Sequence, residues 1–178
     1  MCDFAVADAR DLSKVPESGF DAVLMMGPLY HLIVEGDREI ALGQAFLRLR
    51  RGGVIFSSFL SRLGIFGDLM KRSPEWIEDQ THVSSFLACG KRPEGAPRGG
   101  FRGYFARVSE IAPLHEAAGF RTIVVAGVEP AISADDESFN GLEGEQRERW
   151  LDLLYRISSD QSAAGASRHL LYVDGKPV

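Results

Sequence analysis

The segment from Phe20 to Leu32 constrains the fold of this chain more than any other part. It reads Phe-Asp-Ala-Val-Leu-Met-Met-Gly-Pro-Leu-Tyr-His-Leu, an apolar run of strand length that ends in Gly-Pro. A continuous apolar run is typical of a parallel strand that is buried on both faces. In open α/β sheets, ligands bind just beyond the carboxyl ends of such strands. We therefore expect Tyr30 and His31 to lie at the mouth of a site.

The composition is that of a globular protein with a single core. The chain has 178 residues, of which 45% are hydrophobic and 25% charged, and this length suffices for one domain. A formal net charge of -5 disfavours broad electrostatic binding to nucleic acid. No apolar run approaches the roughly 20 residues that span a bilayer. The two cysteines, Cys2 and Cys89, form no disulfide framework, which favours the cytoplasm.

Strands and helices alternate along the sequence. Apolar or β-branched runs predict strands at residues 4–7, 20–26, 54–59, 120–128 and 169–173. Helical spacing predicts helices at residues 37–50, 63–71, 74–89, 109–119 and 143–158. In the first of these helices we expect Asp37 to be the cap and Ile40, Ala41, Ala45, Phe46 and Leu49 to face inward. The alternation predicts an α/β fold with a mostly parallel sheet.

Five short motifs follow one another in a characteristic order. They are Asp8-Ala9-Arg10-Asp11-Leu12, Gly27-Pro28-Leu29-Tyr30-His31-Leu32, Arg48-Leu49-Arg50-Arg51-Gly52-Gly53, Ala117-Ala118-Gly119-Phe120 and Ser167-Arg168-His169-Leu170-Leu171. Together they resemble the class I S-adenosylmethionine-dependent methyltransferases, in the subgroup that has Gly-Pro-Leu-Tyr-His-Leu after its fourth strand. The resemblance implies a Rossmann-like sheet with strand order 3-2-1-4-5-7-6. This chain would hold strands 3 to 7 with their flanking helices, an N-terminally truncated form of that sheet.

The resemblance also implies a cofactor, S-adenosylmethionine, and the residues that hold it. Asp8 would accept a hydrogen bond from the adenine amine, because an ionised carboxylate only accepts, and the backbone of Ala9 would meet the ring. The backbone of Met26 and Gly27 would hold the methionine ammonium. From the residues alone, Asp8 could equally be a turn residue and Met26 could fill the core.

Tyr30 and His31 are the predicted catalytic residues, and the acceptor implied is a small molecule. Imidazole titrates near neutral pH, so His31 could take a proton from the acceptor. The alternative is a packed histidine that bonds to a backbone carbonyl. Tyr30 could form a wall of the site. The remaining histidines are scattered and the cysteines lack paired spacing, so we expect no metal site.

The glycine-rich cofactor motif of the resembled family is missing from these residues. No Gly-x-Gly-x-Gly loop occurs in the 178 residues, and no acid that would hold the ribose precedes Asp8. We therefore expect residues 1–178 to form a partial methyltransferase domain with impaired activity. The alternative is a non-catalytic remnant that acts as an interaction or folding partner. The apolar strand at residues 20–26 would lose its neighbour, and the exposed edge favours homo-oligomers.

Residues 61–107 interrupt the alternation of strands and helices. In the resembled family this region often covers the substrate, so we expect a substrate cap inserted in the domain. Its aromatic residues could line a cavity or pack the cap onto the sheet; they are Phe66, Trp76, Phe86, Phe101, Tyr104 and Phe105. The single segment Arg98-Gly99-Gly100-Phe101-Arg102-Gly103 is expected to be a surface loop and not a nucleic-acid contact.

Overall fold

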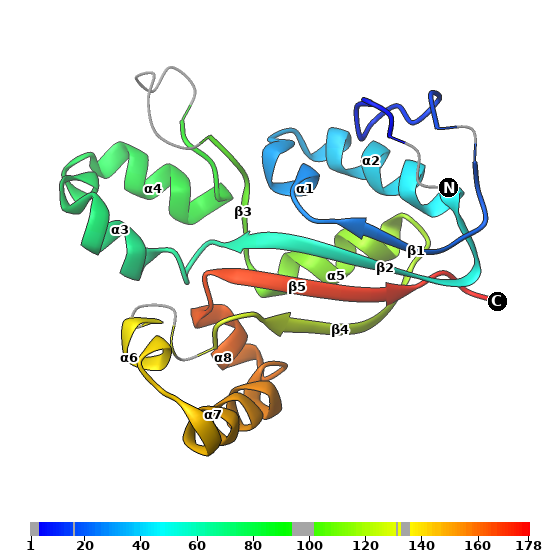
Figure 1. Cartoon of the computed structure of the whole chain (residues 1–178). Coiled ribbons are helices and arrows are strands. Elements are labelled where there is room, and N and C mark those ends of the chain that lie inside the picture. Colours follow the sequence, from blue (N-terminus) through cyan, green and yellow to red (C-terminus); the bar gives the residue numbers. More distant parts are fainter. Residues whose placement is uncertain (1–3, 16, 94–101, 131, 133–135) are drawn as a thin grey trace.

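One mixed sheet organises the molecule (Figure 1). The computed structural model describes residues 4–15, 17–93, 102–130, 132 and 136–178. The strands are β1 (Phe20–Met25), β2 (Leu49–Ser61), β3 (Phe105–Ala106), β4 (Arg121–Gly127) and β5 (His169–Gly175). Their order is β1-β2-β5-β4, and β3 pairs with the end of β2. The fold is therefore the predicted Rossmann-like α/β fold, with the order expected for strands 4-5-7-6.

The direction of the strands determines which ends meet. β1 and β3 run parallel to β2, whereas β5 runs antiparallel to both β2 and β4. The start of β5 therefore lies beside the carboxyl ends of β2 and β4. This edge, together with the carboxyl end of β1, is the edge where ligands bind in α/β sheets.

The helices form three groups around the sheet. The helical segments are α1 (Pro28–His31), α2 (Glu35–Arg48), α3 (Phe66–Arg72), the 3₁₀ helix η1 (Pro74–Glu78), α4 (Gln80–Cys89), α5 (Val108–Ala117), α6 (Asp136–Asn140), α7 (Gly144–Ile157) and α8 (Gln161–Ala166). Helices α1, α2 and α5 contact the sheet and cover one of its faces. Helices α3 and α4 form a cap beyond the end of β2. Helices α6 to α8, which connect β4 to β5 in the sequence, form a second lobe on the β4 side of the sheet (Figure 1).

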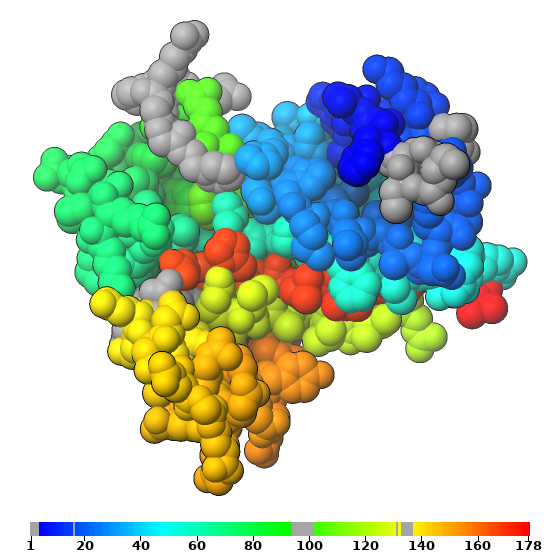
Figure 2. All heavy atoms as spheres, viewed as in Figure 1, coloured from blue at the N-terminus to red at the C-terminus, as the bar shows by residue number. Residues whose placement is uncertain are grey.

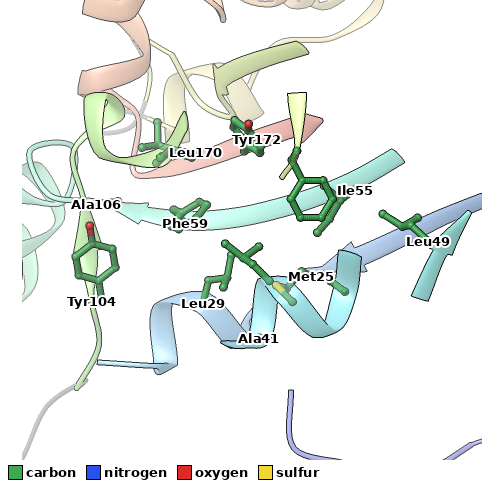
Figure 3. Packing of buried hydrophobic residues seen from close by; sticks show 14 of the residues in the cluster. Met25, Leu29, Ala41, Leu49, Ile55, Phe59, Tyr104, Ala106, Leu170 and Tyr172 are labelled. Carbon is green, nitrogen blue, oxygen red and sulfur yellow. The ribbon is translucent and has the colours of Figure 1, made fainter. Parts of the chain in front are cut away.

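The hydrophobic core lies between the sheet and the first group of helices. Every second residue of β2 from Ile55 to Phe59 is buried, as are Leu170 and Tyr172 of β5. Leu29 of α1 and the alanines and Leu42 of α2 pack against them. Figure 3 shows Met25, Leu29 and Ala41 beside the inner face of the strands. Alternate burial is the pattern of a sheet whose two faces differ.

The opposite face of the sheet carries apolar residues that are only partly covered. Register places Leu24, Phe56, Val173 and Val124 in one row across the four strands, which we call the apolar row. Leu24 is 70% exposed. Figure 2 shows atoms of β5 and β4 at the surface between the cap and the lobe of α6 to α8. The two-sided burial predicted for the β1 segment is therefore wrong, since only one face is covered.

The predicted strand at residues 4–7 is also wrong. These residues are irregular, and Phe4 is 98% exposed. A strand is stable only where its backbone groups pair with a neighbour. In the part of the chain that the structure describes, no strand pairs with residues 4–7, and β1 pairs with β2 alone.

Two helices differ from the prediction in which of their residues are buried. Helix α2 begins at Glu35, so Asp37 lies in its first turn and is not the cap. Ile40 is 51% exposed, and Arg38 and Leu42 are buried in its place. Helix α7 matches the predicted span closely, but of its apolar residues only Leu154 is buried, because the lobe that contains α7 projects from the sheet (Figure 1).

Candidate functional site

A sharp turn connects the end of β1 to α1. Gly27 has a φ of 152°, a value that favours glycine. The side chain of Tyr30 lies back over this turn, since a methyl group on Gly27 would meet Tyr30 Oη at 3.6 Å. The ring centroids of Tyr30 and His31 are 4.7 Å apart. The structure thus places Tyr30 and His31 at the carboxyl end of β1, where the sequence predicts them.

The predicted backbone contacts for the cofactor lie on the same turn. Gly27 is buried, and Met26 is 48% exposed. The side chain of Met26 therefore does not fill the core. The main chain of both residues stands at the ligand-binding edge of the sheet.

Asp8 and Ala9 lie on a loop beside α2. The carboxylate of Asp8 accepts hydrogen bonds from the backbone N of Arg10 at 2.9 Å and from its Nη2 at 2.7 Å. These hydrogen bonds lower the pKa of Asp8 to about 2, so it is ionised and can only accept. Arg10 also donates to Asp37 at 3.0 Å, which ties the loop to α2. Ala9 packs against the core.

A cavity of about 530 Å³ lies between the cap and the end of β2. We call it the cap cavity, and it is lined by Leu60, Ile65, Asp68, Leu69, Ser73, Glu75, Trp76, His82, Phe86, Arg92 and Phe105. Its volume and mixed lining suit a small organic molecule. Among the aromatic residues predicted for the cap, Trp76, Phe86 and Phe105 line this cavity, whereas Phe101 lies outside the described residues.

The aromatic residues of the cap also pack against one another. Ring centroids are 5.5 Å apart for Trp76 and Phe86 and 5.0 Å apart for Phe86 and Phe105. Phe66 packs against Trp76 at 5.8 Å. These distances are typical of edge contacts between aromatic rings. Both readings of the cap aromatics therefore hold, because the same rings pack the cap and line its cavity.

The cap cavity is joined to the end of β1 by a backbone hydrogen bond. The N–H of Tyr104 donates to the carbonyl of Tyr30 at 2.8 Å. Tyr104 directly precedes Phe105, which lines the cavity. The segment that supplies one wall of the cavity is thus attached to α1 beside the predicted catalytic residues.

Asp68 and His82, two of the polar residues that line the cap cavity, lie close to charged groups. Asp68 lies 2.8 Å from Arg72 and 3.6 Å from Arg168. Burial lowers the pKa of His82, and the charge of Arg92 acts in the same direction. The imidazole of His82 is therefore neutral at physiological pH.

A pair of residues at this edge is missed by the sequence analysis. Glu129 follows the end of β4 and His169 starts β5; a carboxylate oxygen of Glu129 pairs with Nδ1 of the His169 ring. The hydroxyl of Ser167 and the backbone N–H of His169 donate to Glu129 at 2.9 and 3.0 Å. Glu129 lies in no motif, and the motif that contains His169 does not indicate this pairing, but the expected strand order brings the end of β4 beside the start of β5 and could have found it.

A second cavity, of about 520 Å³, lies between α2, α4 and α5. Arg62 is 1% exposed and forms a 2.6 Å salt bridge with Glu110. The hydroxyl of Tyr104 donates to the same carboxylate at 2.6 Å. Burial and this hydrogen bond raise the pKa of Tyr104. The guanidinium of Arg38 lies 3.7 Å from the centre of the Tyr104 ring, so these groups form a structural network.

Within residues 4–15, 17–93, 102–130, 132 and 136–178, no three His, Cys, Asp or Glu side chains gather in a way that could hold a metal ion. Over the same residues, no helix has both the length and the apolar character needed to cross a membrane.

Comparison with known proteins identifies the fold. No family model matches the chain, and no curated protein matches it. A SAM-dependent methyltransferase from Methanosarcina mazei is similar in structure over 99% of this chain, with a TM-score of 0.57 and 14% identity. A possible histamine N-methyltransferase from Thermotoga maritima matches 94% of the chain, with a TM-score of 0.51 and 18% identity.

The methyltransferase CcbJ from Streptomyces caelestis is similar over 97% of this chain, with a TM-score of 0.50 and 13% identity. The chain spans 68%, 61% and 63% of the lengths of these three proteins, in the order given. These likenesses cover nearly all of the chain, and the chain therefore has the Rossmann-like fold of the SAM-dependent methyltransferases.

Proposed function

We propose that this chain is the acceptor-binding part of an S-adenosylmethionine-dependent methyltransferase that acts on a small molecule. The observation that carries the proposal is the cap cavity of about 530 Å³, which lies at the carboxyl edge of the sheet within that fold. Residues 61–107, as a substrate cap, would supply most of its walls. A cavity of this size, whose apolar and aromatic walls also carry Asp68, Glu75 and Arg92, suits a small organic acceptor with polar groups.

The residues at the end of β1 suit the proposed cofactor. The backbone at position 27 has a φ of 152°, a value that favours glycine. The main chain of Met26 and Gly27 would hold the methionine part of the cofactor. The exposed carboxylate of Asp8 would accept from the adenine amine, and Ala9 would meet the ring. The cofactor would supply a methyl group on a sulfonium.

The chain's own residues would align the acceptor with that methyl group. Displacement at a sulfonium methyl depends mainly on the alignment of nucleophile, carbon and leaving sulfur. Tyr30 and His31, at the end of β1, would position the acceptor. The Tyr30 ring would form a wall of the site, and His31 would contact the acceptor. The hydrogen bond from the N–H of Tyr104 to the carbonyl of Tyr30 would fix the position of Tyr30 relative to the cap.

Calorimetry with S-adenosylmethionine tests this function. The 178 residues lack a Gly-x-Gly-x-Gly loop, and each missing polar contact contributes on the order of 1 kcal/mol. We expect impaired binding, with a dissociation constant that is raised from the micromolar towards the millimolar range. A micromolar and a millimolar dissociation constant differ by roughly 4 kcal/mol in binding free energy. Low-micromolar binding by these residues would contradict the proposed impairment.

A non-catalytic partner is the second candidate, and the free side of β1 favours it. β1 pairs with β2 alone among the described strands, and the exposed Leu24 begins the apolar row. Such an edge favours association with another strand, including that of a second copy. The coding sequence upstream in the same frame separates the candidates. A Gly-x-Gly-x-Gly loop there supports the enzyme, and its absence supports the remnant.

We also propose a reducing compartment, the cytoplasm, as the location of the protein. Cys89 is exposed and forms no disulfide with any residue that the structure describes, which suits a reducing environment. Mass spectrometry of the protein isolated under alkylating conditions tests this: a free Cys89 thiol is expected, and a mixed disulfide would contradict it.

A further inference from the structure

The imidazole of His169 is held by a carboxylate at one nitrogen only. Glu129 pairs with Nδ1 of the ring and is itself fixed by the Ser167 hydroxyl and the backbone N–H of His169. Among the described residues, no hydrogen bond is made to Nε2 of His169. The side chain of His169 is 49% exposed, whereas that of Glu129 is 19% exposed. The carboxylate therefore orients the ring and leaves Nε2 open towards solvent.

The register of the sheet places this ring beside the cap cavity. His169 is the direct partner of Leu60 in the antiparallel pairing of β5 with β2. Directly opposed residues of an antiparallel pair project from the same face of a sheet. Leu60 lines the cap cavity, whereas His169 does not itself line it; the imidazole lies on the next strand, on the same face of the sheet as a lining residue. Arg168 reaches Asp68, another lining residue, at 3.6 Å.

The charged groups around His169 come from three elements. Glu129 beyond β4 raises the pKa of His169 through its hydrogen bond, and Asp68 of α3 acts in the same direction through its charge. Burial and the neighbouring Arg168 act against this rise. The net effect is an imidazole that is more basic than an ordinary histidine, and whose protonated form is stabilised by Glu129.

We propose that His169, oriented by Glu129, is the general base that removes the proton from the acceptor bound in the cap cavity. The proposal rests on the proposed methyl transfer. Nε2 would take the proton of an O–H or N–H group while the freed lone pair forms a bond to the methyl carbon. The cofactor would supply the methyl group and its sulfur would keep the electrons of the carbon–sulfur bond, while His169 would hold the proton as an imidazolium beside Glu129.

The walls of the cavity indicate the class of acceptor. The rings of Trp76, Phe86 and Phe105 line it, and such surfaces bind flat aromatic or apolar bodies. The acceptor would thus be a small aromatic molecule that carries a hydroxyl or amine group. Its polar group would face His169 at the border next to Leu60.

Labelling with 2-bromoacetophenone tests the position and basicity of His169 without cofactor or acceptor. This probe joins an aromatic ring to a bromomethyl ketone, whose CH2 carbon is attacked by an unprotonated imidazole nitrogen; the nitrogen becomes alkylated and bromide is released. Peptide mapping is expected to find the label on His169, with a rate that saturates as the probe fills the cavity. The variant Trp76→Ala should lose this saturation, whereas Trp150→Ala, in the other lobe, should keep it.

Two variants separate a basic role from a structural one. His169→Asn keeps a donor for Glu129 but has no Nε2, and it should lose the label while the protein stays folded. Glu129→Gln should move the midpoint of the labelling rate to lower pH, because the imidazole loses its carboxylate partner. A label on His82 or His31 in place of His169, or an unchanged midpoint in Glu129→Gln, would overturn the assignment.

The outcome is independent of the proposed methyl transfer itself. If His169 is labelled but no S-adenosylmethionine binds even at millimolar concentration, the reactive pair stands and the proposed function fails. If S-adenosylmethionine binds but the label goes elsewhere, the function stands and another residue is the base.

Discussion

The guanidinium of Arg62 donates to the carboxylate of Glu110 at 2.6 Å, and the arginine side chain is 1% exposed. The same guanidinium donates to the carbonyls of Phe105 and Ala88 at 3.0 and 3.2 Å. One side chain thus connects the end of β2 to β3, α4 and α5. The position of the cap relative to the sheet depends on it.

Loss of Arg62 is expected to destabilise the protein strongly. Arg62→Met removes the donor to the carbonyls of Phe105 and Ala88 and the cationic partner of Glu110, which keeps the hydrogen bond from Tyr104. The expected cost is on the order of 1 to 3 kcal/mol for each acceptor that is left unpaired. The free energy of unfolding of Arg62→Lys should lie between those of the parent and Arg62→Met, because lysine keeps the charge but cannot replace the forked guanidinium. Urea unfolding followed by tryptophan fluorescence measures both. Arg149→Met, which breaks an exposed pair with Glu145, is the control and should change nothing; equal midpoints for Arg62→Met and the parent would contradict the expectation.

Acid is expected to weaken the fold through His115. This residue is fully buried; its ring nitrogens lie 2.9 Å from the carbonyl of Ile111 and 3.1 Å from Ser57 Oγ. Burial lowers its pKa to about 4 from the ordinary 6.5. A neutral folded histidine gives its full stability above pH 6.5, and this is lost as the pH falls through the window towards 4, by roughly 3 kcal/mol in total.

The variant His115→Gln isolates this effect from other titrations. Glutamine does not titrate, so its curve of unfolding free energy against pH should be flatter between pH 6.5 and 4. The difference between parent and variant should therefore shrink as the pH falls. Denaturant unfolding at several pH values measures it, and two parallel curves would show that His115 is not the group responsible.

Substitution of Asp8 is expected to weaken cofactor binding. Asp8→Ala removes the acceptor for the adenine amine and should raise the dissociation constant of S-adenosylmethionine by roughly fivefold. Asp8→Asn should have a smaller effect, since the amide oxygen still accepts. NMR shifts at millimolar cofactor measure even weak binding. Asp11→Ala, a change in the same loop, serves as control; an equal loss in both variants would point to the loop as a whole.

The exposed edge of the sheet is expected to cause association of the chain. Leu24→Lys places a charge in the apolar row beside the free edge of β1 and should shift the protein towards monomer. Leu47→Lys is a matched control, because Leu47 is also well exposed, at 65%, but lies on α2. Size-exclusion chromatography with light scattering gives the mass of each. A parent chain that is already monomeric would rule out association through this edge.

The sequence predicts the sheet better than it predicts its surroundings. The run from Phe20 to Met25 forms β1 as expected because its apolar residues and the Gly-Pro stop act locally. Residues 4–7 carry the same local signal, yet a strand needs a partner, which no local pattern contains. The helical spacing predicts that Ile40 faces the core, but it lies on the exposed face of α2. The reason is that the residue at which a helix begins decides which residues face the core.

The residues of the candidate site also differ in how far the sequence predicts their positions. Tyr30 and His31 follow β1 directly, so the strand prediction places them at the ligand-binding edge. Glu129 follows β4 and His169 begins β5, and only the folded sheet brings the two together. Trp76 and Phe86 illustrate a third case, because aromatic composition indicates a packed cap but not whether its rings leave a cavity.

The position of β5 has a consequence for how the chain acquires its structure during synthesis. β5 follows every other element in the sequence, yet it lies between β2 and β4, and Leu170 pairs with the distant Phe59. Closing such a long loop is slow, because its entropy is lost before the contact forms. A nascent chain on the ribosome therefore exposes the edges of both β2 and β4 until β5 emerges. Chaperone binding during translation should be concentrated in that interval.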